Sequence, residues 1–285
     1  MEWIERLNES INYIEEHINE EIDYEQVAKV ACCSTHHFQR MFAYMANIPL
    51  SEYIRRRRMS LAAVELQSGE KKIIDVALKY GYASPTAFNR AFQSIHGVAP
   101  SAVKKSGTPL RAFLPISFKV TIKGVEELNY RIEKKEPFRI VGISHPLHKE
   151  VEKNFEISPQ MWQKAATDGT IEKLASIADS QPMGILGVSL CDDFEQWRYY
   201  IAAASTKPIN QAFEEYIVPS FTWAIFNGEG RMPEAIQELE KRTVTEWLPT
   251  SGYEYDNGPD IEVYLNADLQ NAKFEVWIPV TKGSI

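Results

Sequence analysis

One short sequence pattern, typical of a small helical unit, occurs twice in this chain. The segment Val27–Phe42 reads VAKVACCSTHHFQRMF, and the segment Val76–Phe92 reads VALKYGYASPTAFNRAF. The residues that recur in step are Ser34/Ser84, Phe38/Phe88, Arg40/Arg90 and Phe42/Phe92. A chain that repeats such a unit presents two similar helices to one repetitive partner. The repetitive partner that we expect is duplex DNA.

Each copy has the local signals of two helices joined by a tight turn. Asp23 is a good N-cap, and apolar residues follow it at helical spacing, which predicts a helix over 24–31. Ser34 and Ser84 can cap the second helix of each copy. Pro85 suits a first helical turn, because its missing N–H costs nothing there.

The second helix of each copy leaves one face for a partner. Its two phenylalanines, four residues apart, should pack against the preceding helix. The remaining polar positions are candidates for reading DNA bases: His36, His37, Gln39 and Arg40 in the first copy, and Thr86, Asn89 and Arg90 in the second. Arg reads guanine and Asn or Gln reads adenine through paired hydrogen bonds in the major groove. These features are typical of helix-turn-helix units.

The segment 49–69 between the copies is predicted to be one helix, with Pro near its start and Gly at its end. At 1.5 Å per residue it spans roughly 30 Å, which approaches the roughly 34 Å between successive major grooves on one side of a duplex. Arg55–Arg58 lie all round this helix. We therefore expect some of them to face solvent or phosphate and others to contact acidic residues.

Residues 1–107 resemble the DNA-binding domain of the AraC/XylS family of transcription regulators, in which a long helix joins two helix-turn-helix units. The resemblance rests on SxxxFQRMF, YIRRRRMSLA, DVALKYGYASPTAFNRAF and GVAPSAVKK. It implies base contacts from the positions of His36, Gln39 and Arg40 and of Pro85, Thr86, Asn89 and Arg90. His36 stands where an aromatic residue is common, Pro85 cannot make a polar contact, and Val103 replaces a usual Tyr. The alternative is an ordinary all-α domain with a solvated arginine face.

The distribution of charge agrees with DNA binding, although the net charge of the whole chain is −8. Residues 34–105 contain eleven Lys or Arg against four Asp or Glu, whereas residues 1–33 contain two against nine. The basic stretch holds both predicted reading helices, as phosphate binding requires. We expect the acidic first helix, over 3–17, to face away from DNA.

The length of 285 residues allows two domains, and the composition is that of a soluble globular protein. No apolar run approaches the roughly 20 residues of a membrane span, and no signal peptide is apparent, so we expect a cytoplasmic protein without membrane contacts. The three cysteines form neither a disulfide framework nor a zinc motif. We interpret His145 and His148 as structural or surface residues, and we expect no metal and no cofactor.

A change from a helical to a strand-rich sequence pattern separates the two domains. Residues 108–124 are predicted to be a linker, because prolines break the helical pattern there. From 125 to 285 the chain alternates strands with helical stretches over 158–178 and 233–247. The order strand-helix-strand-strand occurs twice, which predicts an antiparallel α+β domain. The chain is thus expected to be multidomain, with an all-α tandem helix-turn-helix domain first.

The second domain resembles the GyrI-like effector domain of multidrug-sensing regulators, most clearly in GPDIEVYLN and FEVWIPV. The resemblance implies that a small molecule, often aromatic and cationic, binds in a cleft between the two halves. It also implies a ligand-binding glutamate at the position of Glu262.

The strand period supports this site independently. It places Glu262 and Tyr264 on one face of their strand and Ile261, Val263 and Leu265 on the other. It also places Glu275 on the same face as Trp277. If the apolar faces pack under the helices, the opposite faces present carboxylates among aromatic rings, which favours an organic cation. Further candidates for the walls are Trp162, Trp197, Tyr199, Trp223 and Tyr255. Core packing is the alternative for each ring, and an exposed pair with Lys is the alternative for Glu262.

Three function classes follow. The first is an effector-responsive transcription activator whose partners are double-stranded DNA, RNA polymerase and a small molecule. The second is a small-molecule hydrolase fused to a DNA-binding domain, with Glu262 and Tyr264 as base and acid. The third is a constitutive regulator whose second domain makes only protein contacts. No nucleophile motif or phosphate loop is present, so we predict that the protein is not an enzyme.

Overall fold

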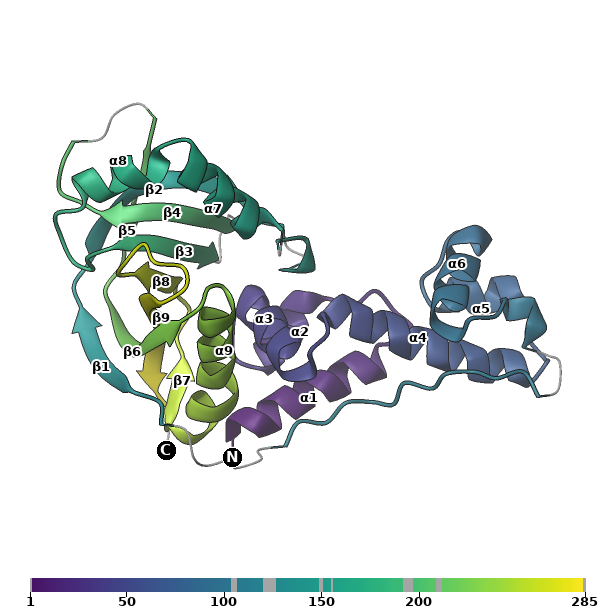
Figure 1. Ribbon diagram of the computed structural model, residues 1–285. Coiled ribbons are helices and arrows are strands. Elements are labelled where there is room, and N and C mark those ends of the chain that lie inside the picture. The colour runs from purple at the N-terminus through teal and green to yellow at the C-terminus, as the bar shows by residue number, and fades with distance from the viewer. Residues whose placement is uncertain are drawn as a thin grey trace. The chain divides into compact units, whose positions relative to one another are not determined.

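The computed structural model describes residues 2–103, 107–119, 127–148, 151–154, 156–191, 197–208 and 212–283. The chain forms two compact units, Met1–Lys119 and Val120–Ile285, which Figure 1 draws in purple to teal and in teal to yellow. Among the described residues, no helix combines the length and the apolar character that a membrane span requires.

The first unit is helical. Its elements are α1 (Glu2–Glu16), α2 (Tyr24–Val30), α3 (Thr35–Ala46), α4 (Leu50–Gln67), α5 (Ile73–Lys79), α6 (Pro85–His96) and the short turn η1 (Pro100–Ala102). The pairs α2/α3 and α5/α6 are the two predicted helix-turn-helix units, and α4 joins them (Figure 1).

The predicted N-caps of three helices are confirmed. The Asp23 side chain accepts hydrogen bonds from the backbone of α2, and Ser34 and Ser84 accept one from the third residue of α3 and of α6. At the other end of these two helices, Asn47 and Gly97 have left-handed backbone, with φ of 54° and 75°. The starts of α2, α3 and α6 are therefore set by short-range hydrogen bonds.

The helix α4 has 18 residues and spans about 27 Å. Three of its four arginines contact acidic residues, as expected for part of the set, and the fourth contacts backbone carbonyls. Arg57 pairs with Glu15, Arg55 and Arg56 pair with Glu52, and Arg58 donates to the carbonyl of Ile18. Phe88 and Phe92 of α6 are fully buried in a core that includes Leu66 of α4, and Val103 is buried there too.

The second unit combines strands and helices. Its strands are β1 (Tyr130–Lys135), β2 (Phe138–Pro146), β3 (Ile185–Cys191), β4 (Trp197–Ala204), β5 (Glu214–Val218), β6 (Phe221–Gly230), β7 (Tyr253–Tyr255), β8 (Asp260–Tyr264) and β9 (Ala272–Lys282). Its helical elements are η2 (Val151–Asn154), α7 (Ile157–Thr167), α8 (Thr170–Ile177), α9 (Glu234–Arg242), η3 (Thr243–Trp247) and η4 (Leu248–Thr250).

The strands form one antiparallel sheet in the order β1-β6-β9-β8-β3-β4-β2-β5, and β7 pairs with β9. The predicted duplication is confirmed as β2-α7/α8-β3-β4 followed by β6-α9-β8-β9. Each half is extended by an outer strand, β5 beside β2 and β1 beside β6. The two halves meet where β3 pairs with β8, at the centre of the sheet.

The helices of both halves pack on one face of this sheet. Ala165 of α7 and Leu174 of α8 pack on Tyr199 and Ile201 of β4, and the ring of Trp247 in η3 lies 5.0 Å from that of Phe226 in β6. The helical stretch expected over 158–178 is two helices, because Gly169 interrupts it with a φ of +78°. The other face carries a separate apolar core that includes Trp223, Ile261 and Trp277.

Candidate DNA-reading helices and effector site

The helix α6 presents its predicted reading residues to solvent. Thr86, Asn89 and Arg90 are all exposed, while Phe88 and Phe92 of the same helix face the core. The exposed residues lie in the first half of α6, and Pro85 occupies its first position. This arrangement leaves an arginine and an amide able to reach base edges in a major groove.

The helix α3 differs from the sequence prediction of an outward polar face. His36, His37 and Gln39 are 7%, 4% and 2% exposed, and Arg40 is half-buried with its Nε atom 3.2 Å from the Tyr44 hydroxyl. Burial, assisted by Arg40, lowers the pKa of His36 to about 3 and that of His37 well below its usual range. Both histidines are therefore neutral at physiological pH. A base contact from any of the three buried side chains requires that it become exposed.

In the second unit, Glu262 lies at the centre of a polar cluster on the helix-covered face of the sheet. The hydroxyl groups of Tyr264 and Tyr199 donate to the same carboxylate oxygen, Oε2, at 2.8 and 3.2 Å. Tyr264 lies two residues along β8, whereas Tyr199 comes from β4, with β3 between the two strands. The predicted pairing of Glu262 with Tyr264 on one strand face is thus present.

A glycine makes room for this cluster. Gly187 of β3 is directly opposite Glu262 of β8 across the centre of the sheet. A Cβ atom at Gly187 would lie 2.4 Å from the Tyr199 hydroxyl and 2.6 Å from Glu262 Oε2, closer than real Cβ contacts. The hydrogen bond between Tyr199 and Glu262 therefore depends on the absence of a side chain at residue 187.

Helix α7 contributes the aromatic wall. The indole N–H of Trp162 donates to the Tyr199 hydroxyl at 2.8 Å, and its ring meets the Tyr264 ring edge-on at 4.7 Å between centroids. Burial, followed by the charge of Glu262, raises the pKa of both Tyr199 and Tyr264 well above the ordinary value. Both phenols therefore stay protonated and act as donors to the carboxylate.

Two predicted wall residues lie on the other side of the sheet. Strand register places Trp277 opposite Ile261 and Glu275 opposite Val263. These four side chains therefore lie on the face of the sheet opposite to that of Glu262. Trp223 and Trp277 belong to the apolar core on that face, with ring centroids 5.7 Å apart. The expectation that Ile261 and Val263 pack under the helices is corrected in the same way. The helices cover the Glu262 face.

The remaining two aromatic candidates share the helix-covered face with Glu262 but have other partners. Trp197 lies two residues before Tyr199 on β4 and packs on Leu147. Tyr255 of β7 donates a short hydrogen bond to Asp260, at the start of β8. The structure thus brings together Trp162, Tyr199, Glu262 and Tyr264, and the sequence analysis did not identify Gly187. A glycine within a strand is the one available signal, since it often marks a close approach of another group.

No group of three or more His, Cys, Asp or Glu side chains in the described part of the chain is placed to hold a metal ion. His145 and His148 are both exposed, and His145 contacts its own neighbouring carbonyl.

Comparisons with known proteins match the helical part and the α+β part of the chain to two separate families. Residues 131–280 match the family described as "Integron-associated effector binding protein" (Cass2), and residues 27–106 match a helix-turn-helix domain family. The chain is 34% identical over 114 residues to the HTH-type transcriptional activator AarP of Providencia stuartii, a match that covers 40% of this chain and 84% of AarP.

Two further proteins are similar to parts of the chain. The regulatory protein SoxS of Salmonella typhimurium is 42% identical over 91 residues, covering 32% of this chain and 85% of SoxS. The crystal structure of a putative transcription regulation protein from Staphylococcus aureus is 19% identical, covering 54% of this chain and 99% of that one, with a TM-score of 0.48. Because one family spans more than half of the chain and AarP is matched over most of its length, the chain belongs to the AraC-type helix-turn-helix transcription regulators that carry a GyrI-like effector-binding domain.

Proposed function

We propose that this regulator responds to a small aromatic cation bound beside Glu262. The observation that carries the proposal is the convergence of two neutral tyrosine hydroxyls on one carboxylate oxygen next to an indole ring. The two tyrosine hydroxyls are neutral donors that orient the carboxylate without cancelling its charge, and aromatic rings lie beside it. Such a site attracts an organic cation through charge and cation–π interaction.

A single substitution isolates the charge. Glu262→Gln keeps the size and part of the hydrogen bonding of the side chain but removes its charge. We expect a loss of about 1.5 to 3 kcal/mol for 1-methyl-4-phenylpyridinium, which is roughly ten- to hundredfold in affinity. The neutral compound of the same shape, 4-methylbiphenyl, should lose much less. Equilibrium dialysis of both compounds with both proteins measures the difference, and equal losses for the two would refute an electrostatic role.

On DNA, we propose that both recognition helices read bases. Thr86, Asn89 and Arg90 support this as an exposed set on α6, and the corresponding set on α3 comprises His36, His37, Gln39 and Arg40. We assign residues 1–107 to DNA binding and residues 125–285 to the effector, with the intervening residues as the connection. Arg40→Ala and Arg90→Ala, tested on a site selected by the wild-type protein, should each relax base preference at different positions.

The direction of regulation is part of the proposal. AarP is described as a transcriptional activator, and we infer that this chain also activates transcription through contact with RNA polymerase in the cytoplasm. Transcription in vitro with purified polymerase tests this directly. A rise in transcript that needs both the protein and its DNA site supports activation, whereas a fall would make the protein a repressor.

A further inference from the structure

Residues 107–119 lie in an extended conformation along the helical unit, although the sequence suggests a simple linker there. They run beside α4 from the α6 end to the α1 end (Figure 1). We call residues 107–119 the strap. The side chains of Leu110, Phe113, Ile116 and Phe118 are half-buried, whereas Leu114 between them is 77% exposed. One side of the strap is therefore docked and the other faces solvent.

We call the helix-turn-helix units α2/α3 and α5/α6 the first and the second reading head. One end of the strap is fixed to the second reading head. The backbone N–H of Arg111 donates to Nδ1 of His96 at 3.2 Å, and Nε2 of His96 lies 3.1 Å from the Met59 carbonyl on α4. His96 is the last residue of α6 and is itself buried. Leu110 and Phe113 pack against the same core as Phe88 and Phe92 of α6.

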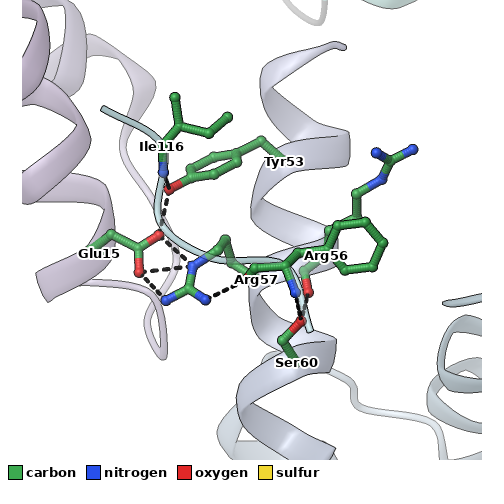
Figure 2. A network of polar contacts seen from close by, with 7 residues as sticks. Glu15, Tyr53, Arg56, Arg57, Ser60 and Ile116 are labelled. Carbon is green, nitrogen blue, oxygen red and sulfur yellow. Dashed lines mark hydrogen bonds and ion pairs between the residues drawn. The ribbon is translucent and has the colours of Figure 1, made fainter. Parts of the chain in front are cut away.

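The middle of the strap is held by a buried ion pair. The Arg57 guanidinium donates to the Glu15 carboxylate at 2.6 and 2.8 Å and to the Phe113 carbonyl at 2.5 Å (Figure 2). Ser60 accepts from the Phe113 N–H at 2.9 Å, and the Tyr53 hydroxyl accepts from the Ile116 N–H at 3.3 Å. One arginine thus joins α1, α4 and the strap, with side chains of Arg57 and Glu15 only 9% and 18% exposed.

The other end is fixed to the first reading head. The side-chain amide of Asn8 on α1 accepts from the Phe118 N–H at 2.8 Å and donates to the Phe118 carbonyl at 3.0 Å, as a paired strand would. The Phe118 ring meets the Phe42 ring of α3 edge-on, with centroids 5.9 Å apart. Phe42 lies on the buried side of the first recognition helix, so the strap contacts the back of that helix.

We propose that the strap sets the relative position of the two reading heads, and that Asn8, Arg57, Ser60 and His96 are positioning residues for DNA reading. The strap contacts α6 at one end, α3 at the other and α4 in between. It therefore restrains both reading heads relative to α4, the helix that joins them. Residue 119 leads directly into the chain of the effector-binding unit.

The test uses the full-length protein and a DNA site selected by the wild type from random duplexes. A second site carries one base pair inserted between the half-sites, which rotates one half-site by about 34°. Anisotropy titration gives the affinity for each site. A braced protein discriminates strongly between the sites. In Asn8→Ala/Phe118→Ala the first head is released from the strap, and we expect the ratio of the two affinities to fall at least about threefold.

A matched control separates positioning from stability. Leu114→Ala changes an exposed strap residue and should leave both the ratio and the melting temperature as in the wild type. A lower melting temperature in the double variant with an unchanged affinity ratio would overturn the proposal, because the strap would then only stabilise the fold. If the double variant unfolds at the assay temperature, Asn8→Ala alone must show a smaller fall in the same ratio, and no fall would equally overturn it.

Discussion

Replacing Gly187 with alanine tests whether the Glu262 cluster has room only because residue 187 lacks a side chain. Alanine in a strand interior is usually favoured over glycine by roughly 0.5–1 kcal/mol. Here the added Cβ atom would lie 2.4 Å from the Tyr199 hydroxyl and 2.6 Å from Glu262 Oε2. One of these groups must move, which strains the packed sheet by about 1–3 kcal/mol and loses a charged hydrogen bond of about 1.5–3 kcal/mol. We expect destabilisation of about 2–5 kcal/mol.

Urea unfolding followed by tryptophan fluorescence measures this change, because five of the six tryptophans lie in residues 120–285. The control is the same substitution in a Tyr199→Phe background, where the nearest obstructing atom is gone. The cost of Gly187→Ala should fall there by on the order of 1 kcal/mol. An equal cost in both backgrounds, or a stabilisation by Gly187→Ala in the wild type, would refute the steric argument.

Three further predictions concern the helical unit. Arg90→Ala should cost about 1–3 kcal/mol on the selected DNA site and relax base preference at one position, whereas a phosphate contact alone would weaken all sequences alike in a binding selection. Affinity for DNA should fall steeply as the salt concentration rises, and each phosphate contact should add about −0.9 to the slope of log affinity against log salt concentration. Anisotropy titrations at several salt concentrations measure this slope, and a slope near zero would contradict the role of the basic stretch 34–105. Glu15→Leu should destabilise the unit by about 3–5 kcal/mol in denaturant unfolding, because it leaves Arg57 buried without its partner. The double variant Glu15→Leu/Arg57→Met should recover most of this stability. Failure to recover it would mean that packing, not charge, is lost.

The helices could be predicted closely because their ends depend on neighbours in sequence. The cap at Ser84, the proline after it and the glycine that ends α6 all act within one or two turns. The burial of His36 and Gln39 could not be predicted from the same pattern, because helical period gives the relation between faces of one helix and not what covers each face. Docking of residues 107–119 was missed for a related reason, since its hydrogen bonds reach side chains as far as 110 positions away in sequence.

The effector site shows where strand period stops being informative. Period two placed Glu262 with Tyr264 and Glu275 with Trp277, and both pairs are present. Which pair faces the helices depends on strand register, and the register puts Val263, not Glu262, opposite Glu275. Trp277 was therefore assigned to the wrong side of the sheet. Gly187 was missed because its role appears only when β3 lies beside β8.

The pairing of Gly187 with Glu262 also explains why the two halves of the duplicated domain had to become unlike. The strands GILGVSL and PDIEVYL occupy equivalent places in the two halves, and residues 187 and 262 are equivalent positions that face each other across the seam. Glutamate at both would set like charges directly opposite each other, with Cβ atoms about 4.5–5.5 Å apart, which destabilises a strand pair. Glycine at both positions would leave the junction of β3 and β8 without a charge. A single central carboxylate is possible only when one half supplies the acid and the other supplies the empty space beside it.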